Sequence, residues 1–103
     1  MNGWILESTG EYPQRLRLPA RAIKTLGRTV RADFIVDAPL VSRLHCRLTA
    51  DASDQLVVED LESTNGTQVN GKAVDRSVLR EGDTLRVGRV EFTVSRAASP
   101  AER

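Results

Sequence analysis

Glu62-Ser63-Thr64-Asn65-Gly66-Thr67 is the most informative stretch of the sequence, because its polar turn-forming residues come shortly after the apolar run Leu56–Val58. Asn and Gly enter positive φ most easily, so we expect the backbone to fold sharply at Asn65-Gly66 and to expose its N–H groups. Asn-Gly is also a common signal for a plain β-turn. Alone, the stretch predicts a tight loop that offers hydroxyl and amide donors, and leaves open whether the loop binds anything.

Two further polar loops precede this one: the first ends an apolar run at Leu26-Gly27-Arg28, and the second, Val41–His45, introduces another. Taken together, the motifs agree in order and spacing as well as in residue type: Gly27-Arg28, Ser42-x-x-His45, Ser63-Thr64-Asn65-Gly66-Thr67 and Val69-Asn70-Gly71. This set resembles the signature of the forkhead-associated (FHA) domain. The resemblance runs from Trp4 to Val94, which is nearly the whole chain.

Length and charge bound the class of protein. The chain has 103 residues, which is enough for one domain with a single core. We expect that domain to span residues 1–96 and a disordered tail to span residues 97–103. The 15 Lys and Arg residues nearly balance the 14 Asp and Glu residues. A general nucleic-acid binder needs a basic excess, so no nucleic-acid partner is expected and any anion site must be local.

Cysteine usage and hydropathy predict a cytoplasmic compartment. The single cysteine, Cys46, cannot form an internal disulfide and is interpreted as a small buried apolar group. The first 11 residues lack the basic and apolar regions of a signal peptide. No stretch approaches the roughly 20 apolar residues that cross a bilayer, so no membrane association is expected.

The pattern along the chain predicts an all-β fold. Short runs of alternating or apolar residues are separated by Gly, Pro and Asn turns, and no long window carries a helical stripe. In the run from His45 to Ala50, Cys46, Leu48 and Ala50 share one face, and His45 is assigned to the other. We predict an antiparallel β-sandwich of short strands, with the binding loops at one end. The expected strands lie at 4–6, 15–18, 23–26, 34–36, 45–50 and 56–59, with a short edge strand near 73–74 after the Asn70-Gly71 turn.

The last hairpin has the clearest local signal. Val87-Gly88-Arg89-Val90 places a glycine first in a two-residue turn between two alternating runs. Counting outward from the turn pairs Val87 with Val90, Arg86 with Glu91, and Leu85 with Phe92. Each of these pairs is matched in chemical kind, which favours this register.

If the polar loops converge, they provide the donors that a phosphate needs. Arg28 supplies charge and a forked set of donors, while Ser42 and Thr64 supply directional hydroxyl donors. Arg43 adds a second charge or is a solvated arginine, and the sequence does not decide between these two. The FHA resemblance implies phosphate contacts for Arg28 and Ser42, a hydroxyl near the phosphothreonine for Thr64, and a contact to the peptide backbone for Asn65.

The remaining motif residues are structural under the same resemblance. It implies that His45 braces the loops from behind, and that Gly27 and Gly66 fix loop shape. Asn70-Gly71 forms the turn into the edge strand. No metal, cofactor or catalytic residue is expected.

The resemblance implies a non-enzymatic module that binds phosphothreonine in a partner protein, expected to be a substrate of a serine/threonine kinase. We expect a monomer. Specificity three residues after the phosphothreonine would be read around Arg31, Leu40 and Gln68, which show no clear preference.

The sequence leaves two other functions open. The first is a phosphate-independent scaffold with the same fold. The second is a hydrolase that uses Ser42 and His45 with Asp60 as the orienting acid, although no nucleophile-elbow pattern surrounds the serine.

Overall fold

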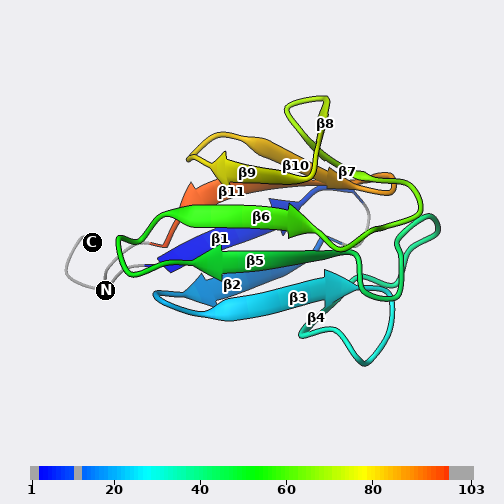
Figure 1. Cartoon of the computed structure of the whole chain (residues 1–103), viewed down its shortest axis with the longest axis horizontal. Helices are drawn as coiled ribbons and strands as arrows, with labels where there is room; N and C mark the ends of the chain where they lie inside the picture. The colour runs from blue at the N-terminus through cyan, green and yellow to red at the C-terminus, as the bar shows by residue number, and fades with distance from the viewer. Residues whose placement is uncertain (1–2, 11–12, 98–103) are drawn as a thin grey trace.

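A computed structural model describes residues 3–10 and 13–97, and the described part consists of strands and loops without a helix. Figure 1 shows the strands stacked in two layers. The strands are β1 (Gly3–Ser8), β2 (Arg15–Pro19), β3 (Ile23–Gly27), β4 (Phe34–Ile35), β5 (Cys46–Ala50), β6 (Leu56–Asp60), β7 (Thr67–Val69), β8 (Lys72–Val74), β9 (Arg76–Leu79), β10 (Thr84–Val87) and β11 (Val90–Arg96).

The strands form two sheets that face each other, which confirms the predicted sandwich. One sheet has the order β2-β1-β11-β10-β7-β8 and the other has the order β4-β3-β5-β6-β9. All pairings are antiparallel except β3 with β4, where Leu26 and Gly27 run parallel to Phe34 and Ile35. The sequence pattern predicts neither that parallel pairing nor the strand β9. No helix in the described part of the chain could span a bilayer.

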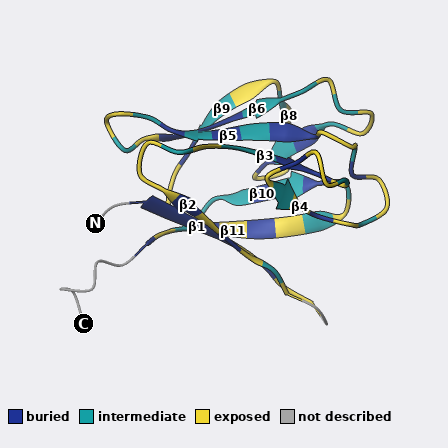
Figure 2. Ribbon diagram, turned by 90° about the horizontal axis from the view of Figure 1, so that it is seen from below, coloured by how far each residue is buried: buried dark blue, intermediate teal, exposed yellow. Residues whose placement is uncertain are grey.

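The core lies between the sheets and follows the predicted alternation. In β5, Cys46, Leu48 and Ala50 are buried while Arg47 and Thr49 are only half-buried. Figure 2 shows buried residues concentrated on the strands and exposed residues in the loops. Burial raises the pKa of the Cys46 thiol to about 12, so the thiol stays neutral and behaves as the expected apolar group.

Both tight turns agree with the sequence. In the β10–β11 hairpin the register is Val87↔Val90, Arg86↔Glu91 and Leu85↔Phe92, as predicted. The Asn70-Gly71 turn has φ values of 52° and 84° and joins β7 to the edge strand β8. Asn70 also bridges to the neighbouring turn, where its Nδ2 donates to Asp83 Oδ1 at 3.0 Å and its Oδ1 accepts from the Thr84 N–H at 2.9 Å.

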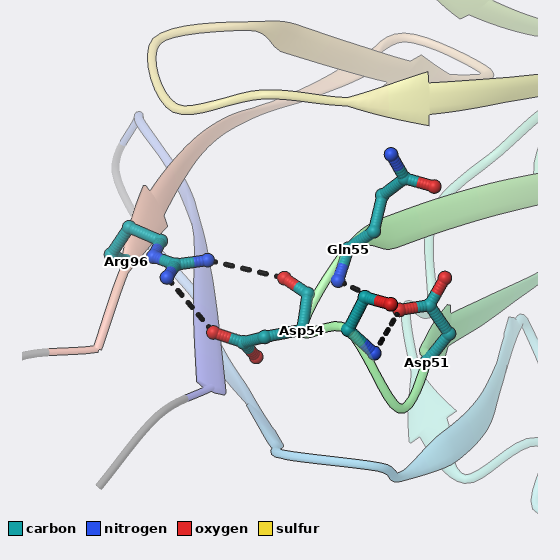
Figure 3. Close-up of polar contacts among 5 residues, drawn as sticks. Asp51, Asp54, Gln55 and Arg96 are labelled. Carbon is teal, nitrogen blue, oxygen red and sulfur yellow. Dashed lines mark hydrogen bonds and ion pairs between the residues drawn. The ribbon is translucent and has the colours of Figure 1, made fainter.

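An arginine clamp closes the end of the sandwich where β11 finishes. Arg96 of β11 donates to the Asp54 carbonyl at 3.2 Å and forms an ion pair with Asp54 Oδ2 at 2.9 Å (Figure 3). Its guanidinium also lies 4.6 Å from the centre of the Trp4 ring. Asp51 fixes the same β5–β6 loop by accepting backbone hydrogen bonds from Ser53 and Gln55, both at 2.9 Å.

The described chain continues one residue past the expected domain boundary. Ala97 is buried, and its N–H donates to the Gly3 carbonyl at 3.0 Å. The rest of the expected tail, residues 98–103, lies outside the described residues. The boundary stays a prediction.

Candidate functional site

The three polar loops meet at the end of the sandwich opposite the arginine clamp (Figure 1). The Arg28 N–H donates to the Ser42 carbonyl at 3.0 Å, which joins the loop after β3 to the loop before β5. The Thr64 N–H donates to Ser42 Oγ at 3.0 Å, which adds the loop after β6. Ser42 therefore links all three loops, and the convergence expected from the sequence is present.

A pocket of about 360 Å³ lies between these loops. Its lining is Arg28, Pro39, Leu40, Val41, Ser42, Thr64 and Asn65. Four predicted contact residues are thus brought together around one hollow. Arg43 is exposed and does not line the pocket, so its role as a phosphate ligand stays a prediction.

The Arg28 side chain is held in position by a neutral group and not by a carboxylate of the described residues. Its Nε donates to the Val41 carbonyl at 2.9 Å, which holds the guanidinium over the pocket. Arg28 forms no ion pair with any described residue, and its two terminal nitrogens make no hydrogen bond within the same part of the chain. The pocket therefore has one cation with free donors, surrounded by neutral groups.

Gly27 is required because the serine loop crosses directly over it. A Cβ at this position would overlap the Arg43 carbonyl oxygen and would lie 2.9 Å from Leu44 Cα. Both atoms are backbone and cannot rotate away. The close approach permits the hydrogen bond from Arg28 N–H to the Ser42 carbonyl, so Gly27 brings two site loops together.

His45 lies behind the pocket and is completely buried. Its Nδ1 accepts from the Ser42 N–H at 3.0 Å, and its Nε2 is 2.8 Å from the Gly66 carbonyl. Because Nδ1 accepts, the ring is the neutral tautomer that donates from Nε2. The assignment of His45 to the outer face of a strand is wrong, because β5 begins at Cys46 and the imidazole turns inward to join two loops.

Asp60 organises the Asn-Gly loop from its base. Its carboxylate accepts from Ser63 N–H at 3.1 Å, Ser63 Oγ at 2.5 Å and Thr67 Oγ1 at 2.7 Å. Desolvation raises the pKa of Asp60, but these hydrogen bonds outweigh it and hold the pKa below its usual value. The loop is therefore closed around an ionised carboxylate, a role that the sequence does not indicate for Asp60.

The turn itself differs from the expected geometry. Gly66 has a φ of 86°, but Asn65 is not in the positive-φ region, and the second such residue in the loop is Glu62 at 56°. The Gly66 N–H donates to Ser63 Oγ at 2.9 Å, so a side chain rather than a type I′ turn closes the bend. Asn65 Nδ2 donates to the Leu40 carbonyl at 3.1 Å, and its Oδ1 makes no hydrogen bond to any described residue.

Leu40 is the strained member of the pocket. It is a non-glycine residue with a φ of 71° and is 44% exposed. Strain of this kind persists only where the surroundings enforce it and is enriched at binding sites. Of the three expected specificity positions, Leu40 lines the pocket, whereas Arg31 and Gln68 do not.

A hydrolase triad is not assembled. His45 accepts the backbone N–H of Ser42 rather than its hydroxyl, and Asp60 bonds to Ser63 and Thr67 rather than to the imidazole. The described residues also contain no group of three or more His, Cys, Asp or Glu side chains that could hold a metal ion. The arrangement suits binding of an anion.

Comparisons with known proteins agree on one family. The sequence profile of the FHA domain matches residues 24–88. The glycogen accumulation regulator GarA of Mycobacterium tuberculosis is 38% identical over 69 residues, which are 67% of this chain and 42% of GarA. A structure from a structural and functional analysis of phosphothreonine-dependent FHA domain interactions has a TM-score of 0.83 at 30% identity, covering 95% of this chain and 98% of that one.

The fold is shared more widely than the sequence. The FHA domain of the CT664 protein from Chlamydia trachomatis has a TM-score of 0.86 at 21% identity, covering 93% of this chain and 99% of that chain. This chain spans less than half the length of the first curated relatives that it matches.

Proposed function

The chain belongs to the forkhead-associated (FHA) domain family, and from this premise we propose that it binds phosphothreonine-containing segments of partner proteins through the pocket around Arg28. The family is one of interaction modules, which accords with the absence of a linked Ser42, His45 and Asp60 triad. Binding, not turnover, is the expected activity.

The observation that carries the proposal is that Arg28 is held in place while its terminal nitrogens stay available. Its backbone and Nε are held by Ser42 and Val41, while its terminal nitrogens remain free of the described residues and lie beside neutral hydroxyl and amide groups. A phosphate needs one strong cation and several directional donors, and a guanidinium provides a matched fork. The hydroxyls of Ser42 and Thr64 supply the remaining donors.

Asn65 fits the role of holding the peptide backbone. Its amide nitrogen is engaged by the Leu40 carbonyl, so the carbonyl side of the same amide is the part free to accept a peptide N–H. This arrangement fixes the orientation of Asn65 before the ligand arrives. We therefore assign Arg28, Ser42 and Thr64 to the phosphate and Asn65 to the main chain of the peptide.

The nature of the partner follows from the ligand. A phosphothreonine in a protein is made by a serine/threonine kinase, so we propose that the partner is a kinase substrate. We also propose that the module acts as a monomer in the cytoplasm.

The test is a titration of matched peptides against the wild-type chain, Arg28→Ala and Arg96→Ala. A degenerate phosphothreonine library first selects the peptide, and the unphosphorylated version provides the reference. Each charge-assisted hydrogen bond contributes about 1.5 to 3 kcal/mol, so Arg28→Ala is expected to weaken binding by at least about tenfold. Arg96→Ala removes the same type of side chain from the far end and is expected to leave affinity unchanged.

The phosphate-independent scaffold predicts a different result. Phosphorylated and unphosphorylated peptides would then bind equally, and Arg28→Ala would have no effect. Retained affinity in Arg28→Ala with an unchanged circular dichroism spectrum would place the phosphate elsewhere.

A further inference from the structure

We infer that a second pocket takes a lysine or arginine side chain of the same phosphopeptide. The first half of the segment 36–41 lines this pocket, and the second half lines the pocket around Arg28. This inference rests on the proposed function. The pocket has a volume of about 380 Å³, and its apolar walls are Ile35, Val36, Ala38 and Val90. Among the described residues that line it, Asp37 is the charged one.

The two pockets are lined by adjoining parts of one segment, residues 36–41, which places them next to each other. Asp37 and Ala38 line the second pocket, and the next three residues, Pro39–Val41, line the pocket around Arg28. Extended chain covers about 3.3 to 3.6 Å per residue. A peptide with its phosphothreonine beside Arg28 therefore reaches the second pocket within about five residues.

The segment 36–41 is held in place without a ligand. The Val36 N–H donates to the Gly27 carbonyl at 2.7 Å, and the Ala38 N–H donates to the Val36 carbonyl at 3.0 Å. A Cβ on Gly88 would lie 3.0 Å from the carbonyl carbon of Leu40, so the β10–β11 turn packs directly against this segment. The segment cannot easily collapse into either pocket.

The opposite wall is also preformed. Ser8 and Gln14 bond to each other twice, with the Ser8 N–H donating to the Gln14 carbonyl at 2.9 Å and the Gln14 N–H donating to Ser8 Oγ at 2.8 Å. Gln14 Nε2 then reaches across to the Ile35 carbonyl at 3.0 Å. This bridge connects the β1–β2 connection to β4 and fixes the distance between the walls.

The residues that line the second pocket fit a basic side chain. Asp37 is exposed and forms no ion pair with any described residue. Lysine and arginine bury a flexible apolar stem while keeping the charged end near water or a carboxylate. The apolar walls suit the stem and Asp37 suits the charge. The two pockets thus have opposite signs, Arg28 in one and Asp37 in the other, and fit a peptide with a phosphate and a basic residue a few positions apart.

The experiment scans an arginine through each of the five positions on either side of phosphothreonine in an otherwise alanine peptide. With arginine at one position, the peptide is expected to bind the wild-type chain about three- to fivefold more tightly than the alanine parent, the upper range for an exposed ion pair. Asp37→Asn is expected to remove that preference and keep the affinity for the alanine parent. Asp37→Lys is expected to shift the preference to glutamate at the same position. Glu81→Gln removes one exposed carboxylate from the β9–β10 turn and serves as the control that should change nothing.

Several outcomes overturn the inference. If the alanine phosphopeptide binds in an Arg28-dependent way but no position favours arginine, the second pocket is not a subsite and the proposed function stands. A preference that survives Asp37→Asn, or that is lost equally in Glu81→Gln, places the basic side chain elsewhere. If no phosphopeptide binds in an Arg28-dependent way, the proposed function fails, and the inference with it.

Discussion

Arg28 and Arg96 lie at opposite ends of the same sandwich, and the protein uses them in opposite ways. Arg96 donates to the Asp54 carbonyl, pairs with the Asp54 carboxylate and stacks on Trp4. Arg28 makes a single side-chain hydrogen bond within the described part of the chain, from Nε to Val41, and keeps its terminal nitrogens available. Arg96 thus stabilises the fold, whereas the donors of Arg28 are available to a ligand.

The difference shows how a binding site can be rigid without neutralising its own charge. At the site end the loops are joined by neutral groups, mainly the Ser42 backbone and hydroxyl, the His45 ring and the Asn65 amide. The one carboxylate in this network, Asp60, is satisfied by Ser63 and Thr67 and does not contact Arg28. Changes at the two ends should therefore have separable effects on stability and on binding.

The largest effect on stability is expected from a substitution at Gly27, where two loops of the site cross closely. Gly27→Ala would drive a methyl group into the Arg43 carbonyl oxygen. Because backbone must move to relieve that contact, we expect the free energy of unfolding to fall by about 3 kcal/mol or more, with loss of peptide binding. Denaturant unfolding followed by circular dichroism measures the change.

Gly82→Ala is the matched control for that substitution. Gly82 has a φ of 93° and open space around it, so an added methyl group causes only conformational strain. We expect the free energy of unfolding to fall by about 1 to 2 kcal/mol with affinity retained. A Gly27→Ala protein as stable as the wild type would show that the crossing is looser than described.

The next effect tests the brace behind the pocket. His45→Ala leaves the Ser42 N–H and the Gly66 carbonyl without their partners and opens a cavity. We expect the free energy of unfolding to fall by about 3 kcal/mol and affinity to fall with it, because both loops lose their anchor. Thermal melting and peptide titration on the same samples measure the two losses.

Two conservative variants separate the contacts of the ring. In His45→Asn the new side-chain carbonyl can accept from the Ser42 N–H, whereas in His45→Gln the longer amide can donate to the Gly66 carbonyl. Each variant is expected to recover part of the stability. A loss of affinity with no loss of stability in His45→Ala would mean that His45 does not brace the loops.

The smallest effect on stability is expected at the far end. Arg96→Ala removes the ion pair with Asp54, the hydrogen bond to the Asp54 carbonyl and the cation–π contact, which together contribute about 1 to 2 kcal/mol. The single tryptophan, Trp4, lies under the guanidinium, so its fluorescence reports the change directly. Affinity for the phosphopeptide should stay the same, and a fall in affinity would show that the two ends are coupled.

The sequence predicts the features that are local. The turns at Asn70-Gly71 and Gly88-Arg89 follow from residue type and alternation, and the structure confirms the edge strand after the first and the predicted register around the second. The four pocket residues, Arg28, Ser42, Thr64 and Asn65, are found through motif spacing, because a sandwich brings loops from one end together.

Features that depend on contacts between distant segments could not be predicted. The inward turn of His45 is decided by Gly66, and the strain at Leu40 is held by Asn65 and by the β10–β11 turn. The pairing of Arg96 with Asp54 joins residues 42 positions apart and has no local signal. The place of Asp37 in the second pocket likewise has no local signal, because Ser8, Gln14 and Val90, which line the same pocket, are distant in the sequence.

The most direct test of the account is calorimetry with three peptides that are identical except for threonine, phosphothreonine or phosphoserine at one position, at two salt concentrations. A shaped pocket beside Asn65 and Gly66 would bury the methyl group of phosphothreonine, which contributes about 0.8 kcal/mol, with a further loss if the recess is left unfilled. We expect phosphothreonine to bind about fourfold or more tightly than phosphoserine at both salt concentrations, and threonine to show no measurable binding. Equal affinities for the two phosphopeptides, both collapsing as salt rises, would contradict the account and leave only a basic surface at Arg28.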